Sequence, residues 1–153
     1  MEINPLLAEL KNPDQAVRDR ATGKLWQIWF EQKGVLGLER LRQSQALLEA
    51  GEVAQAEAVL TALINAQPDF AEAWNRRAVL YYTQSQYKKS LDDCQVVLKL
   101  NPVHFGALHG LGLCHVALEH YSAAIAAFRQ ALEVQPYALV NQKLILECTA
   151  ILS

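Results

Sequence analysis

Apolar residues recur along this chain at the three- and four-residue spacing of amphipathic helices, and the pattern breaks at regular intervals. The clearest stretch has two such runs, which are Trp74, Ala78, Tyr81 and Tyr82, then Tyr87, Leu91, Cys94 and Leu98. Breaks fall near Gly51, Ser85 and Glu119, and a proline ends each second run. The pattern predicts pairs of helices joined by short turns.

The helix pairs repeat with a period of 34 residues, as the prolines Pro68, Pro102 and Pro136 show. The same shift superposes further columns, namely Val53, Tyr87 and Tyr121; Leu60, Cys94 and Phe128; Ile64, Leu98 and Leu132; and Ala56, Ser90 and Ala124. We therefore predict three units, 37–70, 71–104 and 105–138. A proline cannot continue the second helix of a unit, so it fixes the corner into the next unit.

Two units carry a recognisable motif. It reads Trp74-x2-Arg77-Ala78-x2-Tyr81, Ser90-x3-Cys94 and Pro102, then Leu108-x2-Leu111-Gly112-x2-His115, Ala124-x3-Phe128 and Pro136. In its period and its residues this pattern resembles the tetratricopeptide repeat (TPR) family. The resemblance implies an all-α fold, a right-handed TPR solenoid of about three helix–turn–helix repeats.

The sequence departs from the family pattern at three columns. Arg77 stands where leucine is usual, His115 where tyrosine is usual, and Arg40 where an aromatic is usual, so the first repeat is degenerate. A narrower resemblance, carried by 70–78 and 104–112, is to a group of small bacterial and plastid TPR proteins of undefined biochemical role. It implies no activity.

Both flanks of the repeats are expected to be helical caps within one domain overall. At the N-terminus, 1–36 predicts a short helix over about 5–11 and a second helix from the N-cap Asp14 to about Lys33. This second helix aligns as a half-repeat that would cover the first unit, with Leu6, Leu7 and Leu10 over Trp26 and Phe30. At the C-terminus, 139–153 predicts a capping helix.

The C-terminal helix has two apolar sides. Val140, Leu144, Ile145, Cys148, Ile151 and Leu152 form the side expected to face the repeats, while Leu139, Leu146 and Ala150 lie elsewhere. The second side indicates either closer burial or a contact with a partner or a second copy, and so a possible homodimer.

Composition excludes several classes of protein. The 153 residues are 52% apolar with a formal charge of −2, which suits one globular domain and provides no field to attract nucleic acid or an anionic membrane. No cationic start or long uncharged apolar run suggests a targeting or membrane-spanning segment. Three cysteines at spacings that fit neither a zinc site nor a redox pair indicate reduced thiols, and hence a cytoplasmic or organellar stromal location.

Residues that could support catalysis are few, and we expect no enzyme, no cofactor and no metal site. The histidines are His104, His109, His115 and His120, and their spacings place no two of them on one helical face. Adjacent carboxylates at Asp92 and Asp93 diverge by about 100° on a helix. No phosphate-binding, dinucleotide-binding or nucleophile-elbow motif is present. Arg77, in a core column, is expected to form a salt bridge with Glu57, Asp92 or Asp93.

The resemblance also implies a concave surface that binds partners. Its columns hold Arg42, Gln45 and Leu48; Asn75, Arg76, Val79 and Tyr82; and His109, Gly110, Leu113 and Val116. Gly106 and Gly110 would leave room for a pocket, and the arginines would favour an acidic group. The carboxylate clamp that captures chaperone tails is absent, because its columns hold Leu41, Gln45, Arg76, Gly106 and Gly110.

The sequence thus predicts a non-catalytic adaptor that binds a peptide or protein segment. One alternative is a small subunit or assembly factor that docks through the C-terminal helix, with Leu139 and Leu146 as contacts. Another is an RNA-binding helical repeat, which the charge balance disfavours. The surface residues favoured for partner binding are Arg42, Gln45, Asn75, Arg76, Val79, Tyr82, His109 and Leu113.

Overall fold

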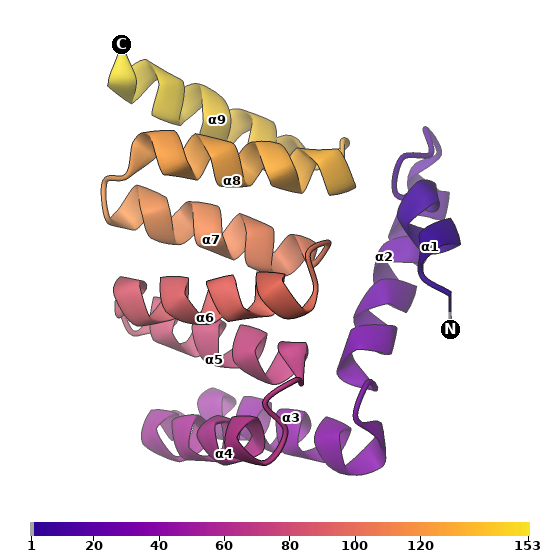
Figure 1. The fold of residues 1–153 in the computed structure, drawn as a ribbon, viewed down its shortest axis with the longest axis vertical. Helices are drawn as coiled ribbons and strands as arrows, with labels where there is room; N and C mark the ends of the chain where they lie inside the picture. Colours follow the sequence, from indigo (N-terminus) through magenta and orange to yellow (C-terminus); the bar gives the residue numbers. More distant parts are fainter. Residues whose placement is uncertain (1) are drawn as a thin grey trace.

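The computed structural model describes residues 2–153, and this part of the chain forms nine α-helices and no strand (Figure 1). The helices are α1 (Asn4–Glu9), α2 (Gln15–Phe30), α3 (Gly34–Glu49), α4 (Val53–Ala66), α5 (Ala71–Thr83), α6 (Tyr87–Leu100), α7 (Phe105–Ala117), α8 (Tyr121–Val134) and α9 (Leu139–Leu152). The predicted all-α class is confirmed. Among the described residues no helix has the length and apolarity needed to cross a bilayer.

Three helical hairpins form the body of the molecule. α3 pairs with α4, α5 with α6 and α7 with α8, and each second helix also packs on the first helix of the next hairpin. α9 packs on α8 in the place that a fourth first helix would take. Figure 1 shows the resulting stack, with α3 and α4 at one end and α9 at the other.

The turn inside each hairpin has one geometry. Gly51, Ser85 and Glu119, which are 34 residues apart, all have left-handed backbones with φ of 80°, 59° and 63°. After each of them, a backbone N–H reaches back to close the helix end, with the bonds Glu52 N to Leu47 O (2.8 Å), Gln86 N to Tyr81 O (2.9 Å) and His120 N to His115 O (2.8 Å). This is the Schellman ending, and it explains the regular breaks in the sequence pattern.

The corners between hairpins are equivalent as well. At each corner, the backbone N–H of the residue two positions after the proline donates to the carbonyl of the residue just before the proline. The three bonds are Phe70 N to Gln67 O (3.0 Å), His104 N to Asn101 O (3.1 Å) and Ala138 N to Gln135 O (3.0 Å). Three corners with the same bonding give the stack its regular advance.

Small residues let the two helices of a hairpin approach closely. Ser90 is buried on α6 and its Oγ donates to the carbonyl of Ala78 at 2.7 Å. In the third hairpin a Cβ on Gly112 would lie 2.3 Å from the Phe128 ring, so only glycine fits there. The aligned columns of small residues therefore mark the tightest helix contacts.

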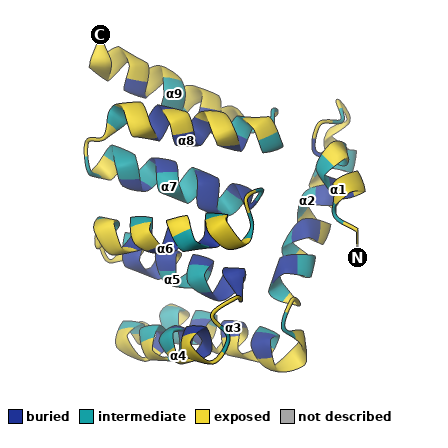
Figure 2. Ribbon diagram, in the orientation of Figure 1, coloured by how far each residue is buried: buried dark blue, intermediate teal, exposed yellow. Residues whose placement is uncertain are grey.

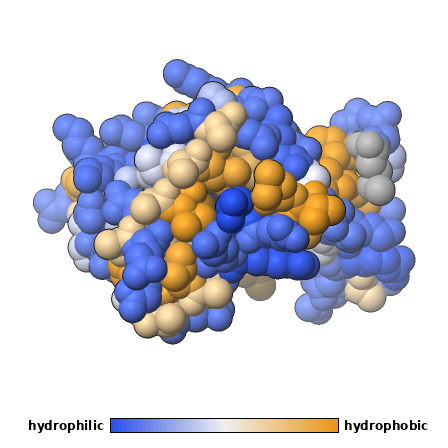
Figure 3. All heavy atoms as spheres, turned by 90° about the horizontal axis from the view of Figure 1, so that it is seen from below, coloured by the Kyte–Doolittle hydropathy of each residue, from blue (hydrophilic) through white to orange (hydrophobic). Residues whose placement is uncertain are grey.

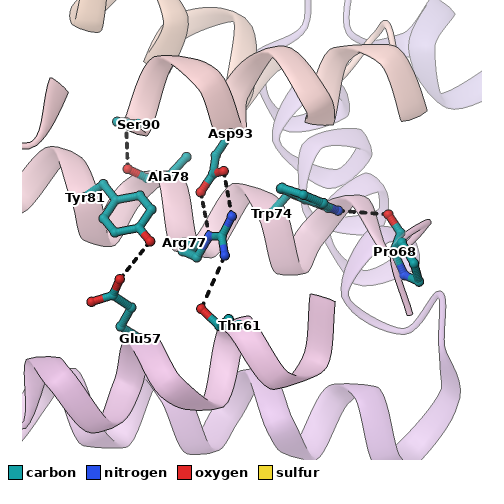
Figure 4. A network of polar contacts seen from close by, with 9 residues as sticks. All are labelled: Glu57, Thr61, Pro68, Trp74, Arg77, Ala78, Tyr81, Ser90 and Asp93. Carbon is teal, nitrogen blue, oxygen red and sulfur yellow. Dashed lines mark hydrogen bonds and ion pairs between the residues drawn. The ribbon is translucent and has the colours of Figure 1, made fainter. Parts of the chain in front are cut away.

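Arg77 forms the ion pair that its column predicts, at the junction of the first two hairpins (Figure 4). Its Nε and Nη2 donate to the two carboxylate oxygens of Asp93 at 2.8 and 2.9 Å, and its Nη1 donates to Thr61 at 3.2 Å. Beside it, the Tyr81 hydroxyl donates to Glu57 at 2.7 Å. Of the three carboxylates considered, Asp93 is the partner, and Glu57 binds Tyr81 instead.

The N-terminal helices differ from the expected half-repeat. As predicted, Asp14 caps α2 by accepting from the N–H of Ala16 at 2.9 Å, and a short helix precedes it. However, α2 does not stack on the first hairpin. It runs crosswise beside the stack, and its buried residues pack on Phe105 at the start of α7 (Figures 1 and 2). We call α1 and α2, Asn4–Phe30, the N-terminal arm.

The arm has its own apolar cluster. Leu6 and Leu10 of α1 pack with the α2 residues Ala21, Leu25 and Trp29, and Trp26 and Leu7 border them. The expected cover of Trp26 is therefore present, whereas Phe30 packs against the core of the first hairpin instead. The half-repeat alignment failed because it matched the spacing of apolar residues and could not indicate which surface they would meet.

Candidate functional site

The first helices α3, α5 and α7 line one surface of the stack, which we call the first-helix face. Two hollows open on it. We call them the central pocket and the arginine pocket, and together they contain eight residues predicted from the sequence as partner contacts.

The central pocket has a volume of about 190 Å³ and a mainly apolar lining. Its walls are Asn75, Ala78, Val79 and Tyr82 from α5, Ser90 and Cys94 from α6, and Gly106, His109, Gly110 and Leu113 from α7. Val79 is 45% exposed, which makes it the most accessible apolar residue of α5. The hollow could therefore accept an apolar side chain.

Polar groups at the edge of the central pocket are already oriented. The Nδ1–H of His109 donates to Asn141 Oδ1 on α9 at 2.7 Å, which fixes the ring. Asn75 is buried and its amide donates to Glu72 at 3.2 Å. Asn75 therefore shapes the pocket wall, while its amide nitrogen is occupied within the protein.

Below the pocket lies a buried thiol pair. The Cys114 thiol donates to Ser90 Oγ at 3.2 Å, and Cys94 lines the pocket floor. A hydrogen bond with Cys114, together with burial, raises the pKa of the Cys94 thiol well above its usual range. Cys94 is thus a neutral, weakly polar part of the floor.

The arginine pocket has a volume of about 240 Å³ and lies between the arm and the first two hairpins. Its lining residues are Phe30, Leu38, Leu41, Arg42, Gln45 and Arg76. Arg76 donates to Gln45 at 3.2 Å, and its guanidinium lies 5.3 Å from the centre of the Phe30 ring. No carboxylate pairs with Arg76 among the described residues, so its charge is available to an anionic group.

A buried acid–histidine pair lies beneath the arm and joins α5 to the start of α7. His104 Nε2 lies 2.8 Å from Glu72 Oε2, and both side chains are fully buried. Because His104 Nδ1 accepts the N–H of Ala107 at 3.1 Å, its proton is on Nε2 and points at the Glu72 carboxylate. Glu72 lies in the first turn of α5, where the helix dipole favours its negative charge.

The arm's aromatic rings close over this pair. Trp29 stacks on the His104 ring with centroids 4.5 Å apart, and Trp26 meets it edge-on at 5.2 Å. A Cβ on Gly106 would lie 2.7 Å from the Trp26 ring, so glycine there makes room for the arm. Gly106 was expected to leave space for a ligand, and part of that space holds Trp26.

The sequence predicts most of the residues that line the two pockets, but several others were missed. Asn75, Val79, Tyr82, His109 and Leu113 do line one pocket, and Arg42, Gln45 and Arg76 line the other. Phe30 was missed because the arm has no repeat pattern to align it. The Glu72–His104 pair was missed because its members lie at opposite ends of one predicted unit, 71–104, and in different columns. The one available signal was Glu72 among apolar residues at a helix start.

The other predicted contacts lie apart from the first-helix face. Leu139 and Leu146 are on α9, with 68% and 70% of their surfaces exposed. His115 is half-buried, and its Nδ1 lacks a hydrogen-bond partner among the described residues. Within residues 2–153, no three His, Cys, Asp or Glu side chains meet in a group that could hold a metal ion.

Stacked hairpins with equivalent corners and an open first-helix face define a helical-repeat protein, a class whose members typically act as non-catalytic binding modules. Models of the tetratricopeptide repeat match residues 41–104 and 105–138. The chain belongs to the tetratricopeptide repeat family.

Curated relatives share only part of their length with this chain. A TPR repeat-containing protein of Rhizobium etli is 37% identical over 70 residues, which cover 46% of this chain and 34% of that protein. A homologue of the BBSome complex member BBS4 from Drosophila melanogaster is 23% identical over 108 residues, or 66% of this chain and 22% of that protein. The chain thus spans about a third or less of these relatives.

Solved TPR domains share the fold. The first TPR domain of Spaghetti (RPAP3), bound to an HSP90 peptide, superposes with a TM-score of 0.72 at 19% identity, covering 75% of this chain and 91% of that one. The Sgt2 TPR domain of Aspergillus fumigatus gives 0.68 at 17% identity, covering 74% and 77%. A complex of the yeast Sti1 TPR2B domain with an Hsp70 peptide gives 0.67 at 16%, covering 73% and 94%.

Proposed function

We propose that this protein is an interaction adaptor that binds a peptide or protein segment on its first-helix face, through the central and arginine pockets. The single observation that carries the proposal is an apolar hollow beside Arg76, which has no acidic partner among residues 2–153. The Spaghetti (RPAP3) domain bound to an HSP90 peptide and the Sti1 domain in complex with an Hsp70 peptide share this fold, which supports this use of it.

The chemistry of the two pockets suggests what the segment contains. Val79, Leu113 and the Tyr82 ring would bury an apolar side chain, and aromatic contacts of this kind contribute strongly to binding. Arg76 and Arg42 would pair with an acidic side chain a short distance away. The expected segment therefore has one apolar anchor residue and one nearby carboxylate.

Selection from random peptides displayed on phage tests this function. We expect enriched sequences to share an apolar residue and an acidic residue at a fixed spacing. By fluorescence polarisation, Val79→Glu and the double variant Arg76→Ala, Tyr82→Ala should each weaken the binding of a selected peptide by about tenfold or more. Undiminished binding by both variants would place the binding surface elsewhere.

A pull-down with mass spectrometry then connects the peptide to a partner. Wild-type protein and the Arg76→Ala, Tyr82→Ala variant are used as matched baits. A partner that uses this face should be recovered by wild-type protein and depleted with the variant. Equal recovery of every captured protein would count against the first-helix face.

A second candidate is docking through α9 as a small subunit of a larger assembly. The observation that favours it is the exposure of Leu139 and Leu146, two large apolar side chains on the outer side of the helix. Loss of a co-purifying protein on Leu146→Glu, with peptide binding retained, would favour this role over the first.

A further inference from the structure

A third hollow, a groove, lies at the end of the stack formed by the first hairpin, α3 and α4. We call it the leading groove. Its volume is about 530 Å³, and it is lined chiefly by Leu36, Arg40 and Gln43 of α3 and by Val59, Ala62 and Ala66 of α4. Seen from below, hydrophobic residues form a band across this end, with hydrophilic residues around it (Figure 3).

In the second hairpin, the residues equivalent to the α3 side of the leading groove are covered by a preceding helix. Leu36 and Gln43 are 34 residues before Phe70 and Arg77. Arg77 bonds Thr61 of the preceding helix α4 (Figure 4), and Phe70 packs in one cluster with α4 residues that include Leu60 and Ile64. Phe70 is fully buried, whereas Leu36 is 60% exposed. The leading groove is therefore the face that a preceding helix covers in the second hairpin.

The composition of this end is that of a contact surface. The second hairpin has the ion pair of Arg77 and Asp93, and the corresponding positions of the first hairpin hold Gln43 and Val59. Ala62 and Ala66 are exposed small residues that would let a helix lie close to α4. A terminal repeat that only met solvent would have a polar outer face.

The opposite end presents a ridge. Leu139, Leu146 and Ala150 lie on the outer side of α9, and all three are exposed. Leu146 shares its column with Ala78 and Gly112, which are both covered by the second helix of their own hairpins. α9 has no such second helix among the described residues.

We propose that the two ends bind each other, with the α9 ridge of one copy lying in the leading groove of the next copy. A ridge of leucines against a groove between two helices is the usual complementarity of packed helices. Among the described residues Arg40 has no carboxylate partner and donates to the neutral Gln43 at 3.0 Å. Glu147, which follows Leu146 on α9, lies 4.0 Å from Lys143 in an exposed ion pair and would have to exchange that partner to reach Arg40. On the next copy, α9 would cover the face that a second helix covers on the following hairpin within one chain, as α4 does on α5 and α6 does on α7.

This contact is head-to-tail, because it joins two different surfaces. Each copy keeps one free groove and one free ridge, so association continues into chains of copies unless a ring closes. One helix against two buries less area than a standard stable interface, so the association should be weak and concentration-dependent.

Sedimentation velocity with light scattering, over concentrations from about 10 to about 500 μM, measures the association. We expect the weight-average mass to rise from 17.1 kDa to at least about twice that value. A mass that stays at 17.1 kDa at every concentration would overturn the proposal.

Two complementary variants test the geometry. Leu36→Glu breaks the groove and leaves the ridge, while Leu146→Glu breaks the ridge and leaves the groove. Each variant alone should be monomeric. Their equimolar mixture should form a dimer through the one intact groove and the one intact ridge, and no larger species.

Other outcomes decide against head-to-tail contact. If Leu36→Glu alone still dimerises, two α9 ridges pair with each other; if Leu146→Glu alone still dimerises, two grooves do. Either result overturns the proposal. Leu100→Glu, an exposed residue of α6, is the matched control that should associate like the wild type. Both test residues are at least 60% exposed, so circular dichroism should show unchanged folding.

Discussion

Arg77 and Asp93 show how the same two columns are filled differently along the stack. In the second hairpin they form a two-bonded ion pair with side chains 16% and 6% exposed. In the third hairpin the corresponding residues are Leu111 and Ala127, which are apolar. Both pairs of side chains fill the two columns, but only the ion pair leaves a buried charge without a partner when one residue is replaced.

Asp93→Ala should therefore lower the free energy of unfolding by about 3 kcal/mol, because it leaves a largely buried guanidinium without its partner. The double variant Arg77→Leu, Asp93→Ala reproduces the pair found in the third hairpin and should recover most of that loss. Urea denaturation measures both. If the double variant were as unstable as Asp93→Ala, the ion pair would stabilise the protein more than apolar side chains in the same two columns can.

Ser85 and Glu119 have left-handed backbones at the position where the first hairpin has Gly51. A side chain in this conformation is strained by contact with its own carbonyl. Ser85→Gly should raise the free energy of unfolding by about 1 kcal/mol, measured in urea. The neighbouring Gln84, with φ of −93°, is the control, since Gln84→Gly should lower stability instead.

His115 makes stability depend on pH. Burial, and then the nearby charge of His120, lower its pKa below the ordinary value. The folded protein therefore takes up this proton less readily than the unfolded chain, so the contribution is complete above the ordinary histidine value and is lost as pH falls through it. His115→Phe should lose less unfolding free energy than wild type between about pH 7.5 and about pH 5.5. Equal losses would show that His115 does not contribute.

At the scale of elements, the N-terminal arm connects parts of the stack that do not otherwise meet. Its Trp29 covers the Glu72–His104 pair, and Arg18 lies 4.1 Å from the centre of the Tyr137 ring, just before α9. The arm thus runs along the corners between hairpins and restrains their relative positions. It also forms one wall of the arginine pocket through Phe30.

Gly106→Val should loosen the arm, because the new side chain would occupy the space of the Trp26 ring. We expect a red shift of tryptophan fluorescence and a stability loss of about 2 kcal/mol. Gly23→Ala on the same arm is the control, since, apart from its neighbours along α2, no atom of the part of the chain that the structure describes lies within 4 Å of its added Cβ. An unshifted spectrum for Gly106→Val would mean that the ring moves aside without loss of packing.

The hairpins could be predicted from sequence because each repeat has its turn residue and its proline at the same positions. Gly51, Ser85 and Glu119 mark the turns, and the three prolines mark the corners, so one alignment determines every element. The surface columns follow from the resemblance to the tetratricopeptide repeat family, which assigns Val79, Tyr82 and Leu113 to one surface, and these residues line one pocket.

The arm could not be placed in this way because it occurs once. Its stripe of Ala21, Leu25 and Trp29 predicts a helix with one buried side, and many surfaces would satisfy it. What selects the observed surface is Phe105 and His104, a long way along the chain, together with the missing side chain at Gly106. The repeat pattern predicts the hairpins, whereas the contacts of the arm with His104, Phe105 and Gly106 occur once in the chain and leave no repeated pattern to detect.

At the scale of the whole molecule, the two proposed surfaces are separate. The first-helix face lies along the side of the stack, and the leading groove lies at its end. Leu36→Glu should therefore abolish association and leave the affinity for a selected peptide within about twofold of wild type. Fluorescence polarisation checks this; a tenfold loss would mean that one surface depends on the other.

The position of the arm has a consequence for synthesis on the ribosome. Residues 4–30 emerge before the hairpins, yet Trp29 can be buried only after His104 and Phe105 have been translated and the third hairpin has formed. Until then, α2 waits in the nascent chain with its tryptophans exposed. Its docking therefore follows the formation of the third hairpin.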